Sequence, residues 1–164
     1  MGDKNQPRHP AGSEKGGQWA KKTVYHGSRS AFKEFRKGKP IWTTENPNLA
    51  NEYANRSSKS RNAGPNIKPF KVDVKNPAIL PGHMGQKVSI SELETALGIT
   101  LNTNISKTKK HLMHRIVNTR KFATALRKAG YDAVGANEEG AQTWGVLDSK
   151  QLTSTFKKGK SRGR

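Results

Sequence analysis

Three residues in the N-terminal third of the chain are of types that could bind a flat polar ligand. His26 is followed by Gly27, and a glycine lets the backbone turn and present bare N–H and C=O groups to a ligand. Trp42 and Tyr53 offer aromatic faces that could cover a planar ring. A neutral imidazole, with an ordinary pKa of about 6.5, could hydrogen-bond to a hydroxyl group. Taken singly, each residue is more readily explained as core or solvated surface, but the three in this order favour a site.

The local sequence predicts the elements that would position these residues. A strand-like run reaches His26 and stops at the glycine, and residues 40–44 form a second short run. Asn46 and Pro47 are typical of a helix start, with a cap residue followed by proline in the first turn. Apolar and aromatic residues then follow at helical spacing as far as Tyr53 and Ala54. The predicted order is strand, polar turn, strand, helix.

The same segment resembles a known nicotinamide pocket. The runs His26-Gly27-Ser28-Arg29, Ile41-Trp42 and Ala50-Asn51-Glu52-Tyr53 resemble ADP-ribosyltransferases of the diphtheria-toxin and poly(ADP-ribose) polymerase branch. In that branch a histidine and glycine on the first strand are followed by an aromatic on a second strand and, eleven residues later, by a tyrosine on a helix. Trp42 and Tyr53 keep this spacing. The chain is most similar to the small domains of phage and bacterial-toxin proteins of the polyvalent type, over residues 23–54 and 129–152.

This resemblance implies an α+β ADP-ribosyltransferase fold with two small, mostly antiparallel sheets that form an NAD cleft. It implies an enzyme that uses NAD as a substrate, without a metal, and transfers ADP-ribose to a host protein or nucleic acid. Tyr53 would stack on the nicotinamide, the backbone of Gly27 would pair with its amide, and His26 would hold the ribose and act as a catalytic residue together with Tyr53. The other residues expected to bind NAD are Ser28, Arg29, Trp42 and Thr43.

The catalytic acid is absent from its matching position. In the family it stands at the start of the final strand, five residues before an aspartate, and Thr143 occupies that position before Asp148. A carboxylate there would stabilise an oxocarbenium-like sugar, and a glutamine could hold the ribose hydroxyl without carrying the charge. The candidates to replace the acid are Glu138, Glu139 and Gln142, and we expect the role to fall on Glu139 or Gln142. The alternative is a catalytically weak NAD- or nucleic-acid-binding protein on the same fold.

The rest of the chain indicates one domain, residues 23–156, between basic tails at 1–22 and 157–164 that we expect to be disordered. Alternating apolar residues predict a strand over 68–74 with a short continuation at 78–80. The closing hairpin is expected as strands 131–136 and 143–148, with a loop over 137–140 between them.

A helical insertion is predicted over residues 89–129. Ser91 and Glu94 indicate a capping box at the start of its first helix, and Gly98 indicates the end. An apolar stripe predicts a second helix over 106–129, ended by Gly130.

A net charge of +19, from 31 Lys and Arg against 12 Asp and Glu, favours a polyanionic partner. Nucleic acid is the expected one, and a solvated basic surface or a basic structural or packaging protein of a virion is the alternative. The residues expected to contact nucleic acid or the acceptor are Arg56, Lys59, Arg61, Lys109, Lys110 and Arg115.

The composition also excludes several classes of site. The chain has no cysteine, which excludes disulfides, zinc-cysteine centres and thiol nucleophiles. His111 and His114 lie three residues apart without a carboxylate at matching spacing, so we expect no metal. No apolar run has the length of a signal peptide or a membrane span. We expect a monomer that acts in a bacterial host cytoplasm, with packaging in a virion as one route there.

Overall fold

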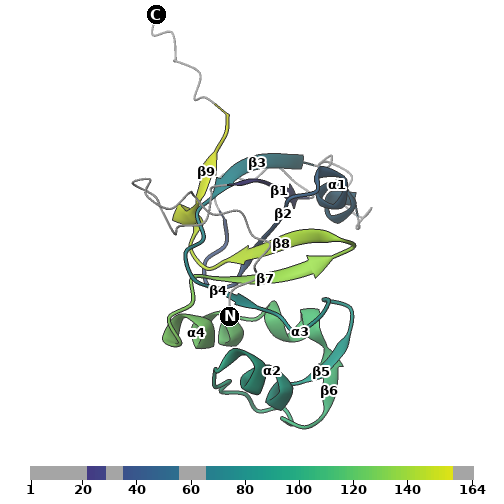
Figure 1. The fold of residues 1–164 in the computed structure, drawn as a ribbon, viewed down its shortest axis with the longest axis vertical. Helices are drawn as coiled ribbons and strands as arrows, with labels where there is room; N and C mark the ends of the chain where they lie inside the picture. Colours follow the sequence, from purple (N-terminus) through teal and green to yellow (C-terminus); the bar gives the residue numbers. More distant parts are fainter. Residues whose placement is uncertain (1–21, 29–34, 56–65, 157–164) are drawn as a thin grey trace, which may run out of the picture.

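A seven-stranded sheet organises the fold in the computed structural model, which describes residues 22–28, 35–55 and 66–156 (Figure 1). The strand order is β4-β7-β8-β2-β1-β3-β9, and the pair of β4 and β7 is parallel while the others are antiparallel. The strands are β1 (Lys22–Ser28), β2 (Ile41–Thr44), β3 (Asn66–Val72), β4 (Pro77–Ile79), β7 (Ala133–Glu138), β8 (Ala141–Val146) and β9 (Leu152–Ser154), with a 3-10 turn η1 (Ser149–Gln151) before the last. The predicted α+β class is confirmed.

The sheet is nearly divided in two between β1 and β2. These strands pair only at Tyr25 and Thr44, whereas β1 pairs with β3 along all seven of its residues. One half therefore contains β1, β3 and β9, and the other contains β2, β8, β7 and β4. Because neighbouring strands that stop pairing must diverge, a cleft can open at this seam.

Helix α1 (Pro47–Asn55) follows β2 and begins where the sequence predicted. The Asn46 side chain accepts hydrogen bonds from the backbone N–H groups of Asn48 (2.9 Å) and Leu49 (3.4 Å), so it caps the helix. Leu49, Ala50 and Ala54 are buried, and Tyr53 remains partly exposed. The helix thus presents its tyrosine away from the core.

The insertion, predicted as helical over residues 89–129, begins earlier, at residue 80 after β4, and packs below the sheet in Figure 1. It contains the β5–β6 ribbon (Lys87–Ser89 and Lys110–Leu112), α2 (Ile90–Leu97), α3 (Met113–Val117) and α4 (Arg120–Lys128). The capping box at α2 is made by Ser89 and Glu92, so the predicted pair of Ser91 and Glu94 is wrong by two residues. The earlier start brings Ile90 into the buried stripe with Leu93 and Leu97. Gly98 ends the helix with a positive φ of 63°, as predicted.

The single helix predicted over 106–129 is wrong, because the segment divides into β6, α3 and α4. Residues 110–112 pair with β5 instead of entering a helix. At the second break, the Thr119 hydroxyl donates to the Ile116 carbonyl (2.8 Å) and accepts from the Phe122 N–H (3.2 Å), which starts α4 afresh. Gly130, with φ of 87°, follows the end of α4 as expected.

The closing hairpin is tighter than predicted. Its turn consists of Glu139 and Gly140, whose φ angles of 50° and 78° are those of a two-residue type I′ turn. Strand β7 therefore continues through Glu138, which pairs with Ala141, and the expected loop over 137–140 is shortened to two residues. This register places Glu138 at the end of β7 and Glu139 in the turn.

Two hydrophobic clusters cover the two faces of the sheet. Along β7, Ala133 packs into one cluster with Val24, Phe70 and Val146, and the next residue, Val134, packs into the other. The second cluster joins the sheet to the insertion through Leu93, Met113, Phe122 and Leu126. The insertion is therefore a packed part of the domain. Over the described ranges, no helix combines the length and the apolar composition that crossing a membrane requires.

Candidate active site

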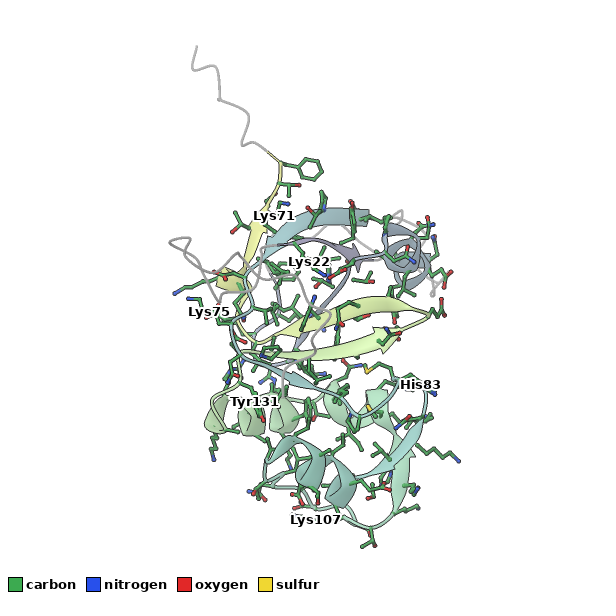
Figure 2. All side chains as sticks on the ribbon, viewed as in Figure 1. Lys22, Lys71, Lys75, His83, Lys107 and Tyr131 are labelled. Atoms are coloured by element: carbon green, nitrogen blue, oxygen red, sulfur yellow. The ribbon has the colours of Figure 1, made fainter. Side chains whose placement is uncertain are left out.

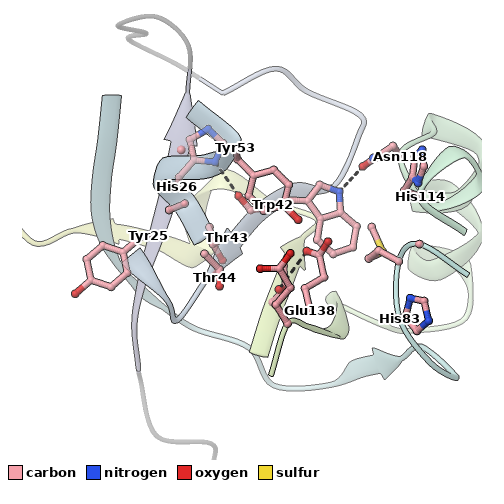
Figure 3. A pocket seen from close by; sticks show the side chains of 16 residues that line it. Tyr25, His26, Trp42, Thr43, Thr44, Tyr53, His83, His114, Asn118 and Glu138 are labelled. Carbon is pink, nitrogen blue, oxygen red and sulfur yellow. Dashed lines mark hydrogen bonds between the residues drawn. The ribbon is translucent and has the colours of Figure 1, made fainter. Parts of the chain in front are cut away.

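A cavity of about 720 Å³ opens beside the seam between β1 and β2 (Figure 3). Five residues predicted to form the NAD site line it: His26, Gly27, Trp42, Thr43 and Tyr53. They reach it from β1, β2 and α1, which are the three elements that the sequence predicted. Neither Ser28 nor Gln142 lines this cavity, and Arg29 lies outside the described residues.

The hydrogen bond of His26 fixes its tautomer. Its Nδ1 lies 2.8 Å from the carbonyl oxygen of Trp42, and a carbonyl can only accept, so Nδ1 carries the proton and Nε2 does not. The ring makes a T-shaped contact with Phe35, and their centroids lie 5.1 Å apart. Burial lowers the pKa of His26, the hydrogen bond to Trp42 opposes that shift, and the charge of Lys68 adds to it. His26 is therefore neutral at pH 7.

Gly27 has a second role besides exposing its backbone to the cavity. A Cβ atom at this position would lie 2.0 Å from the carbonyl oxygen of Ala50 and 3.2 Å from the backbone nitrogen of Ala54. The absence of a side chain lets α1 lie directly on β1. That close approach brings Ala50 and Tyr53 to the same cavity as His26.

The insertion supplies the opposite wall, which the sequence reasoning missed. The Trp42 indole N–H donates to the Asn118 side-chain oxygen, a contact between residues 76 positions apart. Asn118, His83, Met84 and His114 all line the cavity. No motif in the insertion pointed to this wall, because it depends on tertiary packing between segments far apart in the sequence.

The position at which the resemblance predicted the catalytic acid lies in the cavity. Thr143 is buried at 2% exposure and lines the cavity, so its place at the start of β8 is inside the site. Its hydroxyl lies 3.5 Å from a carboxylate oxygen of Glu138 on the neighbouring strand. Glu139 in the turn also lines the cavity. Two carboxylates thus stand beside the position where the family acid is expected.

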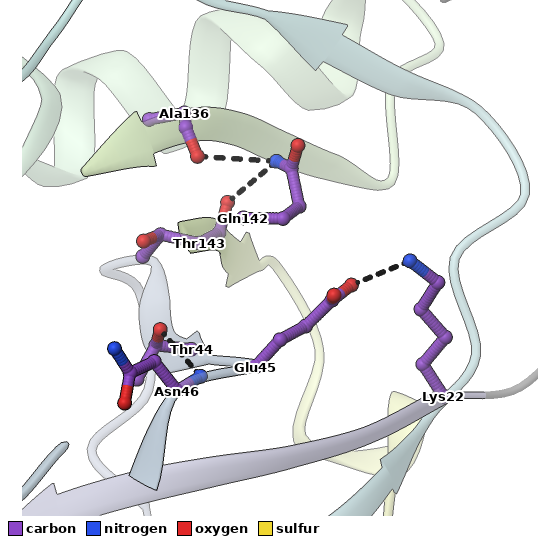
Figure 4. Close-up of polar contacts among 7 residues, drawn as sticks. All are labelled: Lys22, Thr44, Glu45, Asn46, Ala136, Gln142 and Thr143. Carbon is purple, nitrogen blue, oxygen red and sulfur yellow. Dashed lines mark hydrogen bonds and ion pairs between the residues drawn. The ribbon is translucent and has the colours of Figure 1, made fainter. Parts of the chain in front are cut away.

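Gln142 makes its contacts elsewhere. Its amide nitrogen donates to the carbonyl oxygens of Ala136 (3.1 Å) and Thr143 (3.2 Å), as Figure 4 shows. Successive side chains of a strand point to opposite faces, so Thr143 and Gln142 cannot both face the cavity. Nearby, an ion pair between Lys22 and Glu45 (2.8 Å) ties the start of β1 to the end of β2.

The cationic residues expected to bind nucleic acid fall into two groups. Lys109, Lys110 and Arg115 are exposed on the insertion, and Lys110 lies 3.5 Å from Glu92. Arg56, Lys59, Arg61 and nearly all of both tails lie outside the described residues. Within the described part of the chain, no group of three or more His, Asp or Glu side chains is arranged to hold a metal ion.

Comparison with known proteins agrees with this geometry. A family model described as ADP-ribosyltransferase in polyvalent proteins matches residues 17–161. The curated proteins and the solved structures gave no match. The matched region contains the whole sheet, the cavity and the insertion. The chain therefore belongs to the family of ADP-ribosyltransferase domains in polyvalent proteins.

Proposed function

We propose that the cavity binds NAD and that the protein transfers the ADP-ribose of NAD to a macromolecule, in keeping with its family. The observation that carries this proposal is the convergence of His26, Tyr53 and Glu138 on one cavity of about 720 Å³, a size typical of sites for small molecules and cofactors. The resemblance to phage proteins favours a macromolecule of an infected bacterium as the acceptor.

The roles of the lining residues follow from their chemistry. Tyr53 covers one face of the nicotinamide, and the backbone of Gly27 pairs with the carboxamide. Nε2 of His26, which carries no proton, accepts a hydrogen bond from a ribose hydroxyl. Trp42 is held in place by its hydrogen bond to Asn118 and closes the site toward the insertion.

In the reaction, a nucleophilic atom of the acceptor forms a bond to C1′ of the nicotinamide ribose as the bond from C1′ to nicotinamide breaks. The electron pair of the broken bond neutralises the pyridinium, so nicotinamide leaves uncharged. The proton of the acceptor passes to solvent. Positive charge develops on the ribose in the transition state, and a fixed carboxylate stabilises it.

Glu138 is the residue to which we assign this carboxylate role. Its side chain reaches Thr143, the position of the family acid, from the adjacent strand. The sequence favoured Glu139 or Gln142, but the cavity does not include Gln142, and Glu139 occupies a turn position with a positive φ. A glutamate at the end of a paired strand is held more rigidly than one at the tip of a turn.

The test is a set of substitutions followed by measurement of nicotinamide release from NAD. Glu138→Gln keeps the size of the side chain and should slow release about 100-fold or more, by comparison with the loss of other transition-state contacts. Adding Thr143→Glu to that variant should restore part of the rate, because the carboxylate returns to the same point from β8. Glu139→Gln is the matched control.

Two other results would change the residue assigned to the carboxylate role or the proposed function. A large loss in Glu139→Gln with full activity in Glu138→Gln would move the role to the turn. Full activity in both, or no release by the wild type, would favour a protein that binds NAD without transferring ADP-ribose. Thermal unfolding of each variant separates loss of chemistry from loss of fold.

A further inference from the structure

The positive charge of the described residues is concentrated in the insertion. Residues 80–129 contain nine Lys and Arg and two glutamates, a net charge of +7. The other described residues contain eight Lys and Arg and seven Asp and Glu, a net charge of +1. Within the described part of the chain, the sheet is therefore close to neutral and the insertion is the polycation.

Part of this charge lies on one face of the β5–β6 ribbon. The register pairs Lys87 with Leu112 and Ser89 with Lys110, so Lys87 and Lys110 share a face. Val88 and His111 form the opposite pair, and the burial of Val88 shows that their face is turned to the core. The ribbon therefore presents lysines outward.

Helix α3 connects the ribbon to the wall of the cavity. Helix α3 follows β6 directly and exposes His114 and Arg115. Backbone hydrogen bonds from Met113 to Gln86 (2.9 Å) and from His114 to Met84 (3.1 Å) hold α3 against the loop that carries His83. Both histidines line the cavity, so α3 and this loop join the ribbon to the cavity wall.

Several of these cations are available to an external anion. Among the described residues, Lys87, Lys109 and Arg115 are exposed and form no ion pair with a carboxylate. The two glutamates of the insertion, Glu92 and Glu94, are each paired with a lysine. The face is thus suited to a ligand with several negative charges in a row.

The imidazole rings of His83 and His114 indicate which class of polyanion this face would bind. Single-stranded nucleic acids combine a charged backbone with exposed bases, which stack on aromatic side chains, including histidine. His83 and His114 line the cavity from the side of the insertion, as Figure 3 shows. The aspartate and glutamate side chains of an acidic peptide would satisfy the cations but have no ring to stack on the histidines.

We propose that the outer face of the β5–β6 ribbon and α3 bind a single-stranded nucleic acid, and that one of its bases enters the cavity beside His83 and His114 as the acceptor of ADP-ribose. The inference rests on the proposed function. A nitrogen or oxygen of the base forms the new bond to C1′ as nicotinamide leaves with the electron pair of the bond that breaks, and the base loses a proton to solvent.

The binding test uses the full chain and fluorescent single-stranded DNA and RNA of about 20 nucleotides. Anisotropy is measured from about 50 to about 300 mM salt for wild type and for a triple variant, K87Q/K109Q/R115Q. Loss of three phosphate contacts should flatten the slope of log affinity against log salt by about 2, since each contact on a single strand contributes about 0.7. The control, K75Q/K128Q/K150Q, removes the same charge from exposed lysines outside the ribbon and α3. Of these, Lys75 lies on the opposite side of the molecule from His83 in Figure 2. Its slope should stay close to that of the wild type.

In the transfer test, the protein is incubated with the same oligonucleotides and NAD, and the masses of the oligonucleotides are measured by mass spectrometry. The wild type should add ADP-ribose to the oligonucleotide, and K87Q/K109Q/R115Q should add at least several-fold less per nicotinamide released. The inference would be overturned if the slope of log affinity against log salt flattened equally in both variants. It would also be overturned if ADP-ribose were found on protein and never on the oligonucleotide. If the wild type releases no nicotinamide, the proposed function fails, and the anisotropy comparison still decides whether the insertion binds nucleic acid.

Discussion

At the scale of the residue, His26 links the chemistry of the cavity to the stability of the fold. Its imidazole is half-buried and neutral, and its Nδ1–H donates to the Trp42 carbonyl. A protonated ring would place a second proton on Nε2, which could then no longer accept from a ribose hydroxyl. Acid should therefore weaken both NAD binding and folding through the same nitrogen.

The stability effect has a definite sign. Because burial lowers the pKa of His26 in the folded state, the unfolded chain binds more protons below about pH 6.5, and the free energy of unfolding falls as the pH falls through that range. Urea unfolding at about pH 7.5 and 5.5 should show a smaller loss for His26→Gln than for wild type. His114→Gln, at an exposed histidine, is the control. An identical loss in wild type and His26→Gln would contradict the buried neutral state.

At the scale of the element, the close approach of α1 to β1 depends on one missing methyl group. Gly27→Ala would force its Cβ against the Ala50 carbonyl, so the helix must move away from the strand. We expect a loss of about 1 to 3 kcal/mol in the free energy of unfolding, the usual cost of overpacking, together with weaker NAD binding.

A second glycine of the cavity provides the comparison. In Gly85→Ala the nearest atom to the new Cβ would be Nδ1 of His83 at 3.5 Å, an ordinary contact. Urea midpoints of the two variants should therefore differ clearly. If Gly27→Ala unfolds at the same midpoint as Gly85→Ala, the packing of α1 on β1 is looser than described.

At the scale of the whole molecule, the charge of the C-terminal tail can be separated from that of the insertion. Replacing its five Lys and Arg, at positions 157, 158, 160, 162 and 164, with glutamine lowers the net charge from +19 to +14. If the tail contributes only long-range attraction, affinity for single-stranded DNA should fall and its salt slope should flatten. Transfer to the oligonucleotide at saturating concentration should persist. Loss of transfer at saturation would place the acceptor contact on the tail instead.

The sequence was sufficient where the signal was local. Asn46 and Pro47 marked the start of α1, and Gly98 marked the end of α2. The resemblance to the family, carried by the short motifs around Trp42 and Tyr53, correctly implied that both line one cavity. The sequence was not sufficient where the structure depends on which distant segments pair with each other. Residues 110–112 have helical periodicity, yet they pair with β5, and the Thr119 hydroxyl divides the predicted helix. Likewise, no local pattern could show that Asn118 would meet Trp42.

The hairpin of β7 and β8 has a consequence for how such a site can change over generations. Glu138 and Thr143 reach the same point from adjacent strands, with 3.5 Å between their side-chain oxygens. A chain with glutamate at both positions would always have one carboxylate in place. If Glu138 has the proposed carboxylate role, the acid could pass from one strand to the other by two single substitutions, in either direction, without an inactive ancestor between them. The carboxylate would then keep its location on the sheet, and two descendants of one enzyme could carry it at different positions in their sequences.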